Sequence, residues 1–176
     1  MARIVLFGNS GSGKSTLALR LARDTRLPHL DLDVVAWTGA EPPERRAAAE
    51  SARDIEAFME GGDGWVIEGC YADLVAVAAR RATCLVFLNP GMEACKANAR
   101  ARPWEPHKYT TKEKQDAGLA FLLGWIGEYE TREDVYSLKA HRAVFDAFKG
   151  DRVELTSREA IAAYDGTAQP RIASHA

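Results

Sequence analysis

One glycine-rich segment constrains the fold of this chain more than any other part of the sequence. Residues 8–15 read GNSGSGKS, which fits the pattern G-x-x-x-x-G-K-[ST] at every fixed position. The apolar run IVLF at residues 4–7 comes directly before the segment, and apolar or small residues recur at helical spacing across residues 17–25 after it. A buried strand, a glycine-rich turn and an amphipathic helix are the context in which this pattern forms a phosphate-binding loop.

The residue types in this loop suit a nucleoside triphosphate. Glycines let the backbone wrap closely around a polyphosphate so that consecutive N–H groups face its oxygens, and the following helix adds its positive N-terminal end. We expect Lys14 to reach the β- and γ-phosphates, the hydroxyl of Ser15 to ligate the accompanying Mg²⁺, and Thr16 to support that hydroxyl. The expected nucleotide-binding residues are Gly8, Asn9, Ser10, Gly11, Ser12, Gly13, Lys14, Ser15 and Thr16.

Beyond the loop, strand and helix patterns alternate along the chain. The predicted strands cover residues 4–7, 29–35, 65–67, 83–88 and 152–155, and the later predicted helices cover residues 44–60, 72–81, 92–102, 112–129, 133–148 and 157–164. This alternation predicts an α/β fold in which helices cover both faces of a parallel sheet. We expect one domain over residues 1–164 and a loose tail over residues 165–176.

Composition narrows the class of protein. Hydrophobic residues make up 47% and charged residues 27% of the 176 residues, which is ordinary for a globular protein. The formal net charge of -2 gives no general attraction to nucleic acid or to an anionic membrane, and no run of residues is long and apolar enough to span a bilayer. The three cysteines lack zinc-type spacing, so we expect free thiols in a cytoplasmic protein.

Carboxylates follow two of the predicted strands. Asp31 and Asp33 lie at the end of the second strand, and Glu68 ends the third. Ligands gather at the carboxyl ends of parallel strands, so these side chains are candidates to meet the Mg²⁺-nucleotide. We expect Asp33 to act as a base toward a phosphate acceptor or to hold Mg²⁺ through water, and Glu68 to support the metal; Asp31 fits better as a solvated strand residue.

Basic residues gather in and around a proline-broken loop over residues 100–112, which we interpret as a lid. Arg100 and Arg102, together with Arg132 beyond it, are the expected phosphate contacts, because guanidinium groups bind phosphate oxygens in pairs. His107, Lys108 and Lys112 belong to the same basic group, about half of which we expect to be ordinary surface charges. On the predicted acceptor-side helix over residues 44–60, Arg45, Arg46 and Arg53 could hold a phosphate of the acceptor or could equally be surface charges.

These motifs together resemble the P-loop kinases of the nucleoside monophosphate and shikimate kinase group. The segments LDVVAW at residues 32–37 and WVIEGCY at residues 65–71 are similar to stretches of kinase-like proteins labelled DNA topology modulation proteins. The resemblance implies a five-stranded parallel sheet in the order 2-3-1-4-5, a lid and ATP as phosphate donor. It supports Lys14, Ser15, Asp33 and Glu68, and also Arg132 through the segment REDVY; Glu68 stands where the family usually has aspartate.

Three functions are compatible with a triphosphate site. The leading hypothesis is an ATP-dependent, Mg²⁺-requiring kinase that phosphorylates a small metabolite or a nucleoside monophosphate. The alternative is a nucleotide-binding regulator without turnover, as the DNA topology label suggests, although the mild acidity argues against nucleic acid as a partner. A GTPase switch is the weakest of the three hypotheses, because neither an Asn-Lys-x-Asp nor an Asp-x-x-Gly motif occurs in the chain.

Overall fold

The computed structural model describes residues 1–104 and 110–167. Within these residues, five strands form one parallel sheet in the order β2-β3-β1-β4-β5. The strands are β1 (Arg3–Gly8), β2 (His29–Asp31), β3 (Trp65–Gly69), β4 (Cys84–Leu88) and β5 (Asp151–Leu155). The helices are α1 (Lys14–Thr25), α2 (Asp33–Ala36), α3 (Ala48–Glu60), α4 (Ala72–Ala79), α5 (Met92–Arg100), α6 (Lys112–Ala117), α7 (Leu119–Gly127), α8 (Leu138–Ala147) and α9 (Arg158–Ala163).

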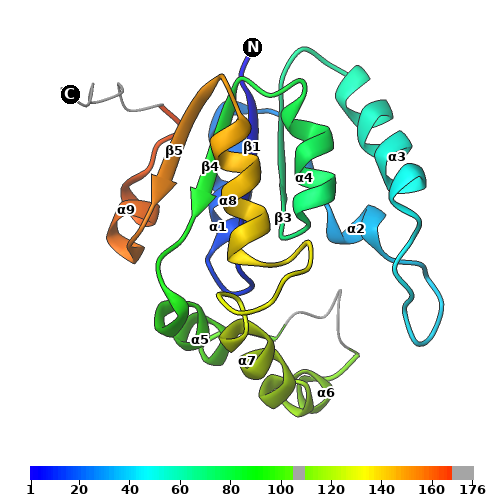
Figure 1. The fold of residues 1–176 in the computed structure, drawn as a ribbon, viewed down its shortest axis with the longest axis vertical. Coiled ribbons are helices and arrows are strands. Elements are labelled where there is room, and N and C mark those ends of the chain that lie inside the picture. The colour runs from blue at the N-terminus through cyan, green and yellow to red at the C-terminus, as the bar shows by residue number, and fades with distance from the viewer. Residues whose placement is uncertain (105–109, 168–176) are drawn as a thin grey trace.

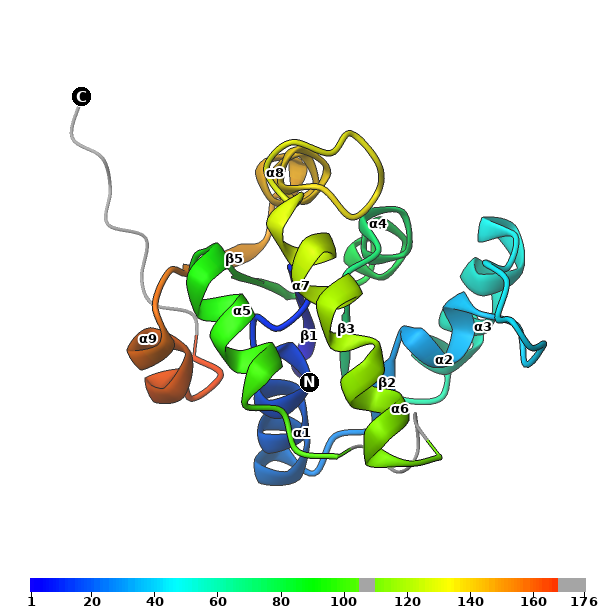
Figure 2. The same ribbon diagram turned by 90° about the horizontal axis from the view of Figure 1, so that it is seen from below.

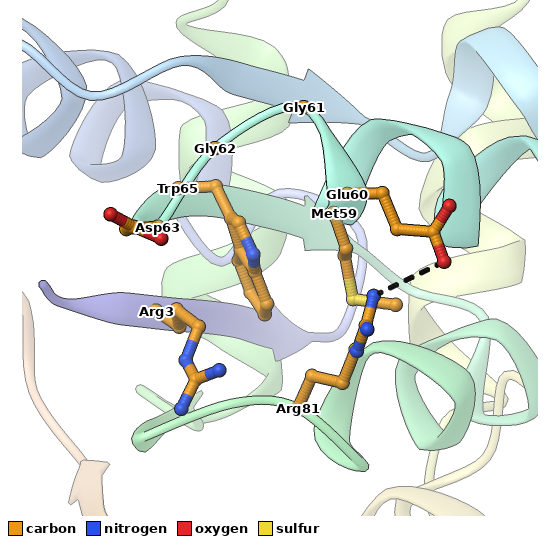
Figure 3. Close-up of a pocket in the computed structure, with 8 residues that line it drawn as sticks. All are labelled: Arg3, Met59, Glu60, Gly61, Gly62, Asp63, Trp65 and Arg81. Atoms are coloured by element: carbon orange, nitrogen blue, oxygen red, sulfur yellow. Dashed lines mark ion pairs between the residues drawn. The ribbon is translucent and has the colours of Figure 1, made fainter.

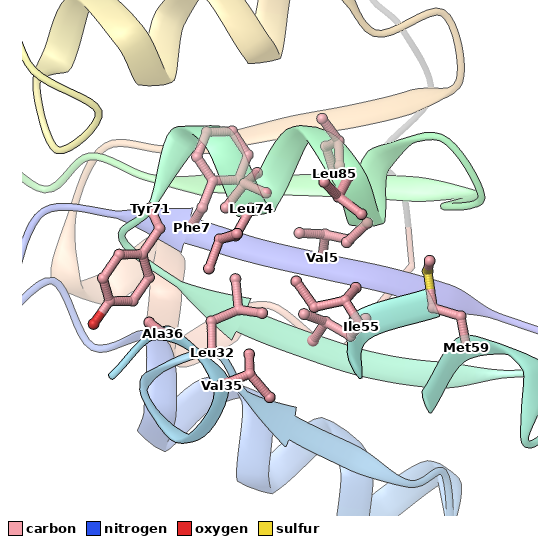
Figure 4. Packing of buried hydrophobic residues seen from close by; sticks show 14 of the residues in the cluster. Val5, Phe7, Leu32, Val35, Ala36, Ile55, Met59, Tyr71, Leu74 and Leu85 are labelled. Carbon is pink, nitrogen blue, oxygen red and sulfur yellow. The ribbon is translucent and has the colours of Figure 1, made fainter. Parts of the chain in front are cut away.

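The sheet lies between two layers of helices, as Figures 1 and 2 show. On one face, Val5, Phe7, Ile67 and Leu85 of the strands pack with α2, α3, α4 and α8 (Figure 4). On the other face, alternate strand residues such as Ile4 and Leu6 pack with α1 and α9. β1, β3 and β4 are covered on both sides, which explains why they read as continuous apolar runs. The predicted α/β fold and its strand order are therefore confirmed.

A third apolar cluster lies apart from both faces of the sheet. It joins Cys95 and Ala99 of α5 to Ile126 of α7, with Leu119 and Leu122 packed against them. Figures 1 and 2 place α5, α6 and α7 together beyond the end of the sheet where β4 stops. The segment from α5 to α7 thus has a small core of its own at the carboxyl ends of the strands.

The second strand is shorter than the sequence predicts. Residues 29–35 alternate as a strand would, but β2 ends at Asp31 and α2 begins at Asp33. The carboxylate of Asp31 accepts a hydrogen bond from the backbone N–H of Asp33 at 2.9 Å, which turns the chain, and Ala36 then donates to the carbonyl of Leu32 at 2.9 Å. The turn buries Leu32 and Ala36 in the core, and this tertiary packing outweighs the local strand preference.

Three predicted helices begin more than two residues late or are interrupted, whereas the other predicted helices after the glycine loop differ from the structure by at most two residues at either end. The helix expected over residues 44–60 begins only at Ala48, because the chain before it is extended and Arg45 forms an isolated bridge with Trp37. The helix expected over residues 112–129 is interrupted at Gly118, which separates α6 from α7. The helix expected over residues 133–148 begins at Leu138, where the hydroxyl of Ser137 caps it by accepting from the N–H of Ala140.

Candidate active site

The glycine loop connects β1 directly to α1, and its path leaves no room for side chains at two positions. Gly8 has a φ of 147°, and a Cβ there would lie 2.2 Å from the carbonyl oxygen of Leu88. A Cβ on Gly11, whose φ is 75°, would lie 2.4 Å from the carbonyl oxygen of Cys95. The loop therefore packs by backbone contact against the end of β4 and against α5, which only glycine permits.

Two asparagine side chains fasten this loop to the segment from α5 to α7. The amide of Asn98 in α5 donates to the carbonyl of Gly11 at 2.8 Å. The amide of Asn9 donates to the carbonyl of Ile126 in α7 at 3.2 Å. Asn98 was missed by the sequence interpretation, because nothing in its local pattern distinguishes it from any polar residue on a helix.

Lys14 is the buried cation of the loop. Its side chain is only 8% exposed, and its ammonium group donates to the carbonyl of Asn9 at 2.8 Å, across the loop. Ser15 and Thr16 follow it in the first turn of the 12-residue helix α1 and are exposed. The loop thus combines a positive helix end, a lysine held over the backbone and accessible hydroxyls, which is the set of groups that a polyphosphate with Mg²⁺ requires.

Glu68 lies beside this loop as a buried carboxyl group. It is paired in register with Leu6 of β1 and Asp31 of β2, and it is 1% exposed. Its Oε1 has no hydrogen-bond partner within the described part of the chain. Burial, followed by the negative charge of Asp31, raises the pKa of Glu68 to about 7, although the Lys14 ammonium and a hydrogen bond with Ser15 act in the opposite direction.

The two aspartates near Glu68 have different surroundings. Asp31 ends β2, and its charge is the second largest cause of the raised pKa of Glu68. The sequence analysis treated Asp31 as a solvated strand residue and did not anticipate this effect on Glu68. Asp33 begins α2, and its Oδ1 accepts a hydrogen bond of 2.5 Å from the hydroxyl of Tyr71. The structure therefore gathers Lys14, Ser15, Glu68 and both aspartates at the carboxyl ends of β1, β2 and β3.

The candidate arginines fall into two groups. Arg132 is held by the protein itself: its guanidinium carbon lies 3.3 Å from the ring centroid of Trp125, and its Nε lies 3.2 Å from a carboxylate oxygen of Asp134. Arg100 is exposed in the last turn of α5, and it lines a small hollow together with Arg102 and Lys112. The expected lid residues His107 and Lys108 lie outside the described residues.

The arginines of the predicted acceptor side are also engaged with the protein. Arg45 binds Asp73 at 3.1 Å and the carbonyl of Ala36 at 3.2 Å. Arg46 binds Asp54 at 2.7 Å. Only Arg53 of the three is an exposed side chain on α3. In this structure, Arg45 and Arg46 connect α2 and the chain after it to α3 and α4.

A neutral histidine supports the chain just beyond Glu68. His141 is fully buried; its Nε2 lies 2.9 Å from the carbonyl of Cys70, and its Nδ1 lies 2.7 Å from the hydroxyl of Tyr129. Because a carbonyl only accepts, Nε2 carries the proton and Nδ1 accepts from Tyr129. Burial lowers the pKa of His141 to about 4, so the ring is neutral and serves as a fixed bridge.

A separate hollow of about 360 Å³ lies where β1 and β3 begin, at the end of these strands opposite to the glycine loop (Figure 3). It is lined by Arg3 and Trp65, which begin β1 and β3, and by Arg81, which lies 3.7 Å from Glu60. The glycine loop follows the other end of β1, so this hollow is no part of the phosphate site. No helix in the described part of the chain is both long and apolar enough to cross a membrane.

Comparisons with known proteins yield matches at the level of structure. No protein-family model and no curated protein sequence matches the chain. A sugar kinase from Janibacter sp. HTCC2649 matches with a TM-score of 0.48 and 16% identity, covering 92% of this chain and 91% of its own. A shikimate kinase from Bacteroides thetaiotaomicron matches with a TM-score of 0.48 and 18% identity, covering 92% of each chain.

A gluconokinase from Sinorhizobium meliloti 1021 matches with a TM-score of 0.45 and 16% identity, covering 92% of this chain and 90% of its own. The similar structures thus include several enzymes described as small-molecule kinases. At this level of similarity, the functional interpretation depends on the residues of the site itself.

Proposed function

We propose that this protein is an ATP-dependent phosphotransferase that moves the γ-phosphate of ATP to a small metabolite or a nucleoside monophosphate. The observation that carries the proposal is the buried carboxyl group of Glu68, which lies beside Lys14 and Ser15 and keeps one oxygen without a partner among the described residues. An unsatisfied buried carboxyl next to a phosphate-binding loop is costly for a fold, and it is expected where a ligand completes the site.

The nucleotide-binding role is assigned to the loop from Gly8 to Thr16. Its backbone N–H groups and the positive end of α1 would hold the phosphates, and Lys14 would neutralise charge on the β- and γ-phosphates. Lys14 is already fixed by the carbonyl of Asn9 at 2.8 Å, so little side-chain freedom is lost when a nucleotide binds.

The residues present also fit Mg²⁺. No group of three or more His, Cys, Asp or Glu side chains in the described residues could hold a metal ion alone. Mg²⁺ commonly keeps several waters and uses one or two protein ligands together with substrate phosphates. Ser15 would be the direct ligand, with Glu68 and Asp33 holding its water molecules. When bound, Mg²⁺ supplies charge stabilisation to the transferring phosphoryl group.

The acceptor side is assigned to Asp33 and the lid. In the transfer, a bond forms between the acceptor oxygen and the γ-phosphorus while the bond from that phosphorus to the ADP oxygen breaks. Asp33 would accept the hydrogen bond of an acceptor hydroxyl and take its proton as the new bond forms. Arg100 and Arg102 would approach the phosphates from the segment that begins with α5. Arg132 would need to exchange its present ion pair with Asp134 for a phosphate contact.

One assay separates this proposal from a non-catalytic regulator. Purified protein is incubated with ATP, Mg²⁺ and a panel of hydroxyl-bearing metabolites, nucleosides and nucleoside monophosphates, and ADP release is followed. Release that depends on one acceptor supports the kinase; tight ATP binding without such release across the panel favours the regulator. The same assay with GTP in place of ATP tests the hypothesis that the protein is a GTPase switch.

Two lysine variants provide the matched comparison. Lys14→Ala removes the cation of the loop, and we expect acceptor-dependent turnover to fall by at least about 100-fold, as for loss of a charged transition-state contact. Lys149→Ala removes an exposed lysine after α8 and should leave turnover unchanged. Equal activity of both variants would exclude the glycine loop as the site of phosphate transfer.

A further inference from the structure

The hollow at the start of β1 and β3 contains hydrogen-bond donors that the protein leaves without acceptors. The indole N–H of Trp65 and the Nε of Arg3 are both buried, and neither has a hydrogen-bond partner among the described residues. Trp65 as a whole is only 1% exposed. Buried N–H groups are nearly always paired, because an unpaired one destabilises the fold. Two such groups at one hollow therefore indicate an acceptor that does not belong to the chain.

The sheet holds Arg3 and Trp65 next to each other. They are register partners in the parallel pair of β1 and β3, and partners on neighbouring strands lie about 4.8 Å apart with their side chains on the same face. The backbone is fixed on both sides, since the N–H of Trp65 donates to the carbonyl of Ala2 at 3.0 Å and the N–H of Arg3 donates to the hydroxyl oxygen of Thr83 at 3.0 Å. The two donors thus start from a rigid part of the fold.

The turn over residues 61–64, between α3 and β3, forms one rim of the hollow. A Cβ on Gly64 would lie 2.8 Å from the carbonyl oxygen of Ala2, so the turn packs closely on the start of β1. Arg81, which follows α4, lies on another side, and Figure 3 shows its guanidinium group and the side chains of Met59 and Trp65 directed toward the same space. Arg81 lies 3.7 Å from Glu60, and its guanidinium group donates no hydrogen bond to any residue that the structure describes.

The charges around the hollow favour a singly charged ligand. Two arginines, Arg3 and Arg81, are balanced by two exposed carboxylates, Glu60 and Asp63. A doubly charged anion would be repelled by both carboxylates, whereas a carboxylate carries one charge and can accept two parallel N–H bonds from a guanidinium group. The volume of about 360 Å³ is in the range of sites for small molecules.

We propose that this hollow is a binding site for a small carboxylate, separate from the phosphate site. The guanidinium of Arg3 and the indole N–H of Trp65 donate to the carboxylate oxygens, and Arg81 exchanges its loose contact with Glu60 for the ligand. The two buried N–H groups become accessible when the flexible side chains of Met59 and Arg81 turn aside. The ligand satisfies both donors and so stabilises the folded protein. This site does not depend on the proposed kinase activity.

The direct test observes the indole N–H of Trp65 while acetate is added. Protein labelled with ¹⁵N in its tryptophan side chains is followed by NMR at constant ionic strength, with acetate replacing chloride. The signal of Trp65 is the one that disappears in Trp65→Phe. We expect it to shift in a saturable way, with half-saturation at about 1–10 mM acetate, whereas the indole signals of Trp37, Trp104 and Trp125 stay unchanged.

Two neighbouring arginines provide matched variants. Arg81→Gln removes a guanidinium that lines the hollow, and Arg80→Gln removes one that lies outside it; each arginine lies 3.7 Å from a glutamate of α3. We expect Arg3→Gln to raise the half-saturating acetate concentration by at least about 10-fold, the effect of losing a charge-assisted hydrogen bond, and Arg81→Gln to raise it less. Arg80→Gln should leave it unchanged.

Several results would overturn the proposal. A Trp65 signal that does not respond to acetate would show that water alone satisfies the indole N–H. An equal response in wild type and Arg3→Gln would exclude Arg3 as the anion contact, and tighter binding of inorganic phosphate than of acetate would refute the preference for a carboxylate. If Trp65→Phe does not fold, Phe variants of the other three tryptophans assign the signal by elimination. The measurement needs no nucleotide, so the absence of kinase activity would leave this test intact.

Discussion

Glu68→Gln should make the protein more stable while it weakens the candidate metal site. The side chain of Glu68 is 1% exposed, and its Oε1 has no hydrogen-bond partner among the described residues. Burial is the main reason that its pKa rises to about 7. Above this pH the folded protein must hold a carboxylate in a buried position beside Asp31, and glutamine removes that charge without changing the shape of the side chain.

The expected size follows from the difference between the two states. The pKa of Glu68 is about 7 in the folded protein against an ordinary value of 4.5, a difference of about 2.5 pH units. At about 1.4 kcal/mol for each unit, ionised Glu68 lowers the free energy of unfolding by roughly 3 kcal/mol above pH 8. Between pH 4.5 and pH 7 the folded state binds more protons than the unfolded state, so stability falls as the pH rises through this range.

A buried amide keeps part of the desolvation cost, so the variant should gain somewhat less than the full difference. We expect the free energy of unfolding of Glu68→Gln to exceed that of the wild type by roughly 2–3 kcal/mol at pH 8.5, and to equal it near pH 5. For a chain of this length, the gain corresponds to a rise in melting temperature of roughly 4–12 °C. Urea unfolding of the nucleotide-free protein at several pH values measures it.

Two further measurements complete this prediction. Glu60→Gln changes an exposed glutamate that lies 3.7 Å from Arg81, and its stability should match the wild type at every pH. Addition of Mg²⁺-ATP should stabilise the wild type more than Glu68→Gln, because the carboxylate is the proposed metal support. A stability difference between Glu68→Gln and the wild type that stays constant from pH 5 to pH 8.5 would refute the reasoning.

Three other changes test separate parts of the structure. Gly8→Ala places a methyl carbon 2.2 Å from a backbone carbonyl oxygen at a φ of 147°, and it should lower the free energy of unfolding by more than about 2 kcal/mol. Gly39→Ala is the control, because no atom lies within 4 Å of the new carbon, and it should change the free energy of unfolding little. Urea unfolding compares the two variants. Burial lowers the pKa of His141 from 6.5 to about 4, so the free energy of unfolding should fall by roughly 3 kcal/mol as the pH falls from 6.5 to 4. Urea unfolding measures this pH dependence in Glu68→Gln, where the opposing titration of Glu68 is absent. Adding His141→Gln to that variant should make the free energy of unfolding nearly independent of pH over this range. Asn98→Ala removes the amide that holds the glycine loop at 2.8 Å and should weaken ATP binding by roughly 3- to 10-fold in calorimetry; unchanged affinity would show that the loop needs no support from α5.

The order of elements could be predicted from the sequence because its signals are local. The glycine pattern of residues 8–15, the apolar runs of β1, β3 and β4 and the turns between them depend on neighbours in the chain. The second strand could not be predicted in the same way. Alternation over residues 29–35 favours a strand, but the burial of Leu32 and Ala36 under other segments makes a helical turn more stable.

The glycine loop, the α/β class of the fold and the gathering of Asp31, Asp33 and Glu68 at one edge follow from the sequence by itself, because parallel strands all end at the same edge. The tertiary structure alone decided the state of these groups. Burial between neighbouring strands determines that Glu68 carries a raised pKa, and contacts across more than 30 positions of the chain bring Trp37 and Asp33 to the hydroxyl of Tyr71. Burial and long-range hydrogen bonds depend on residues that are distant in the chain, so no local pattern in the sequence reports them.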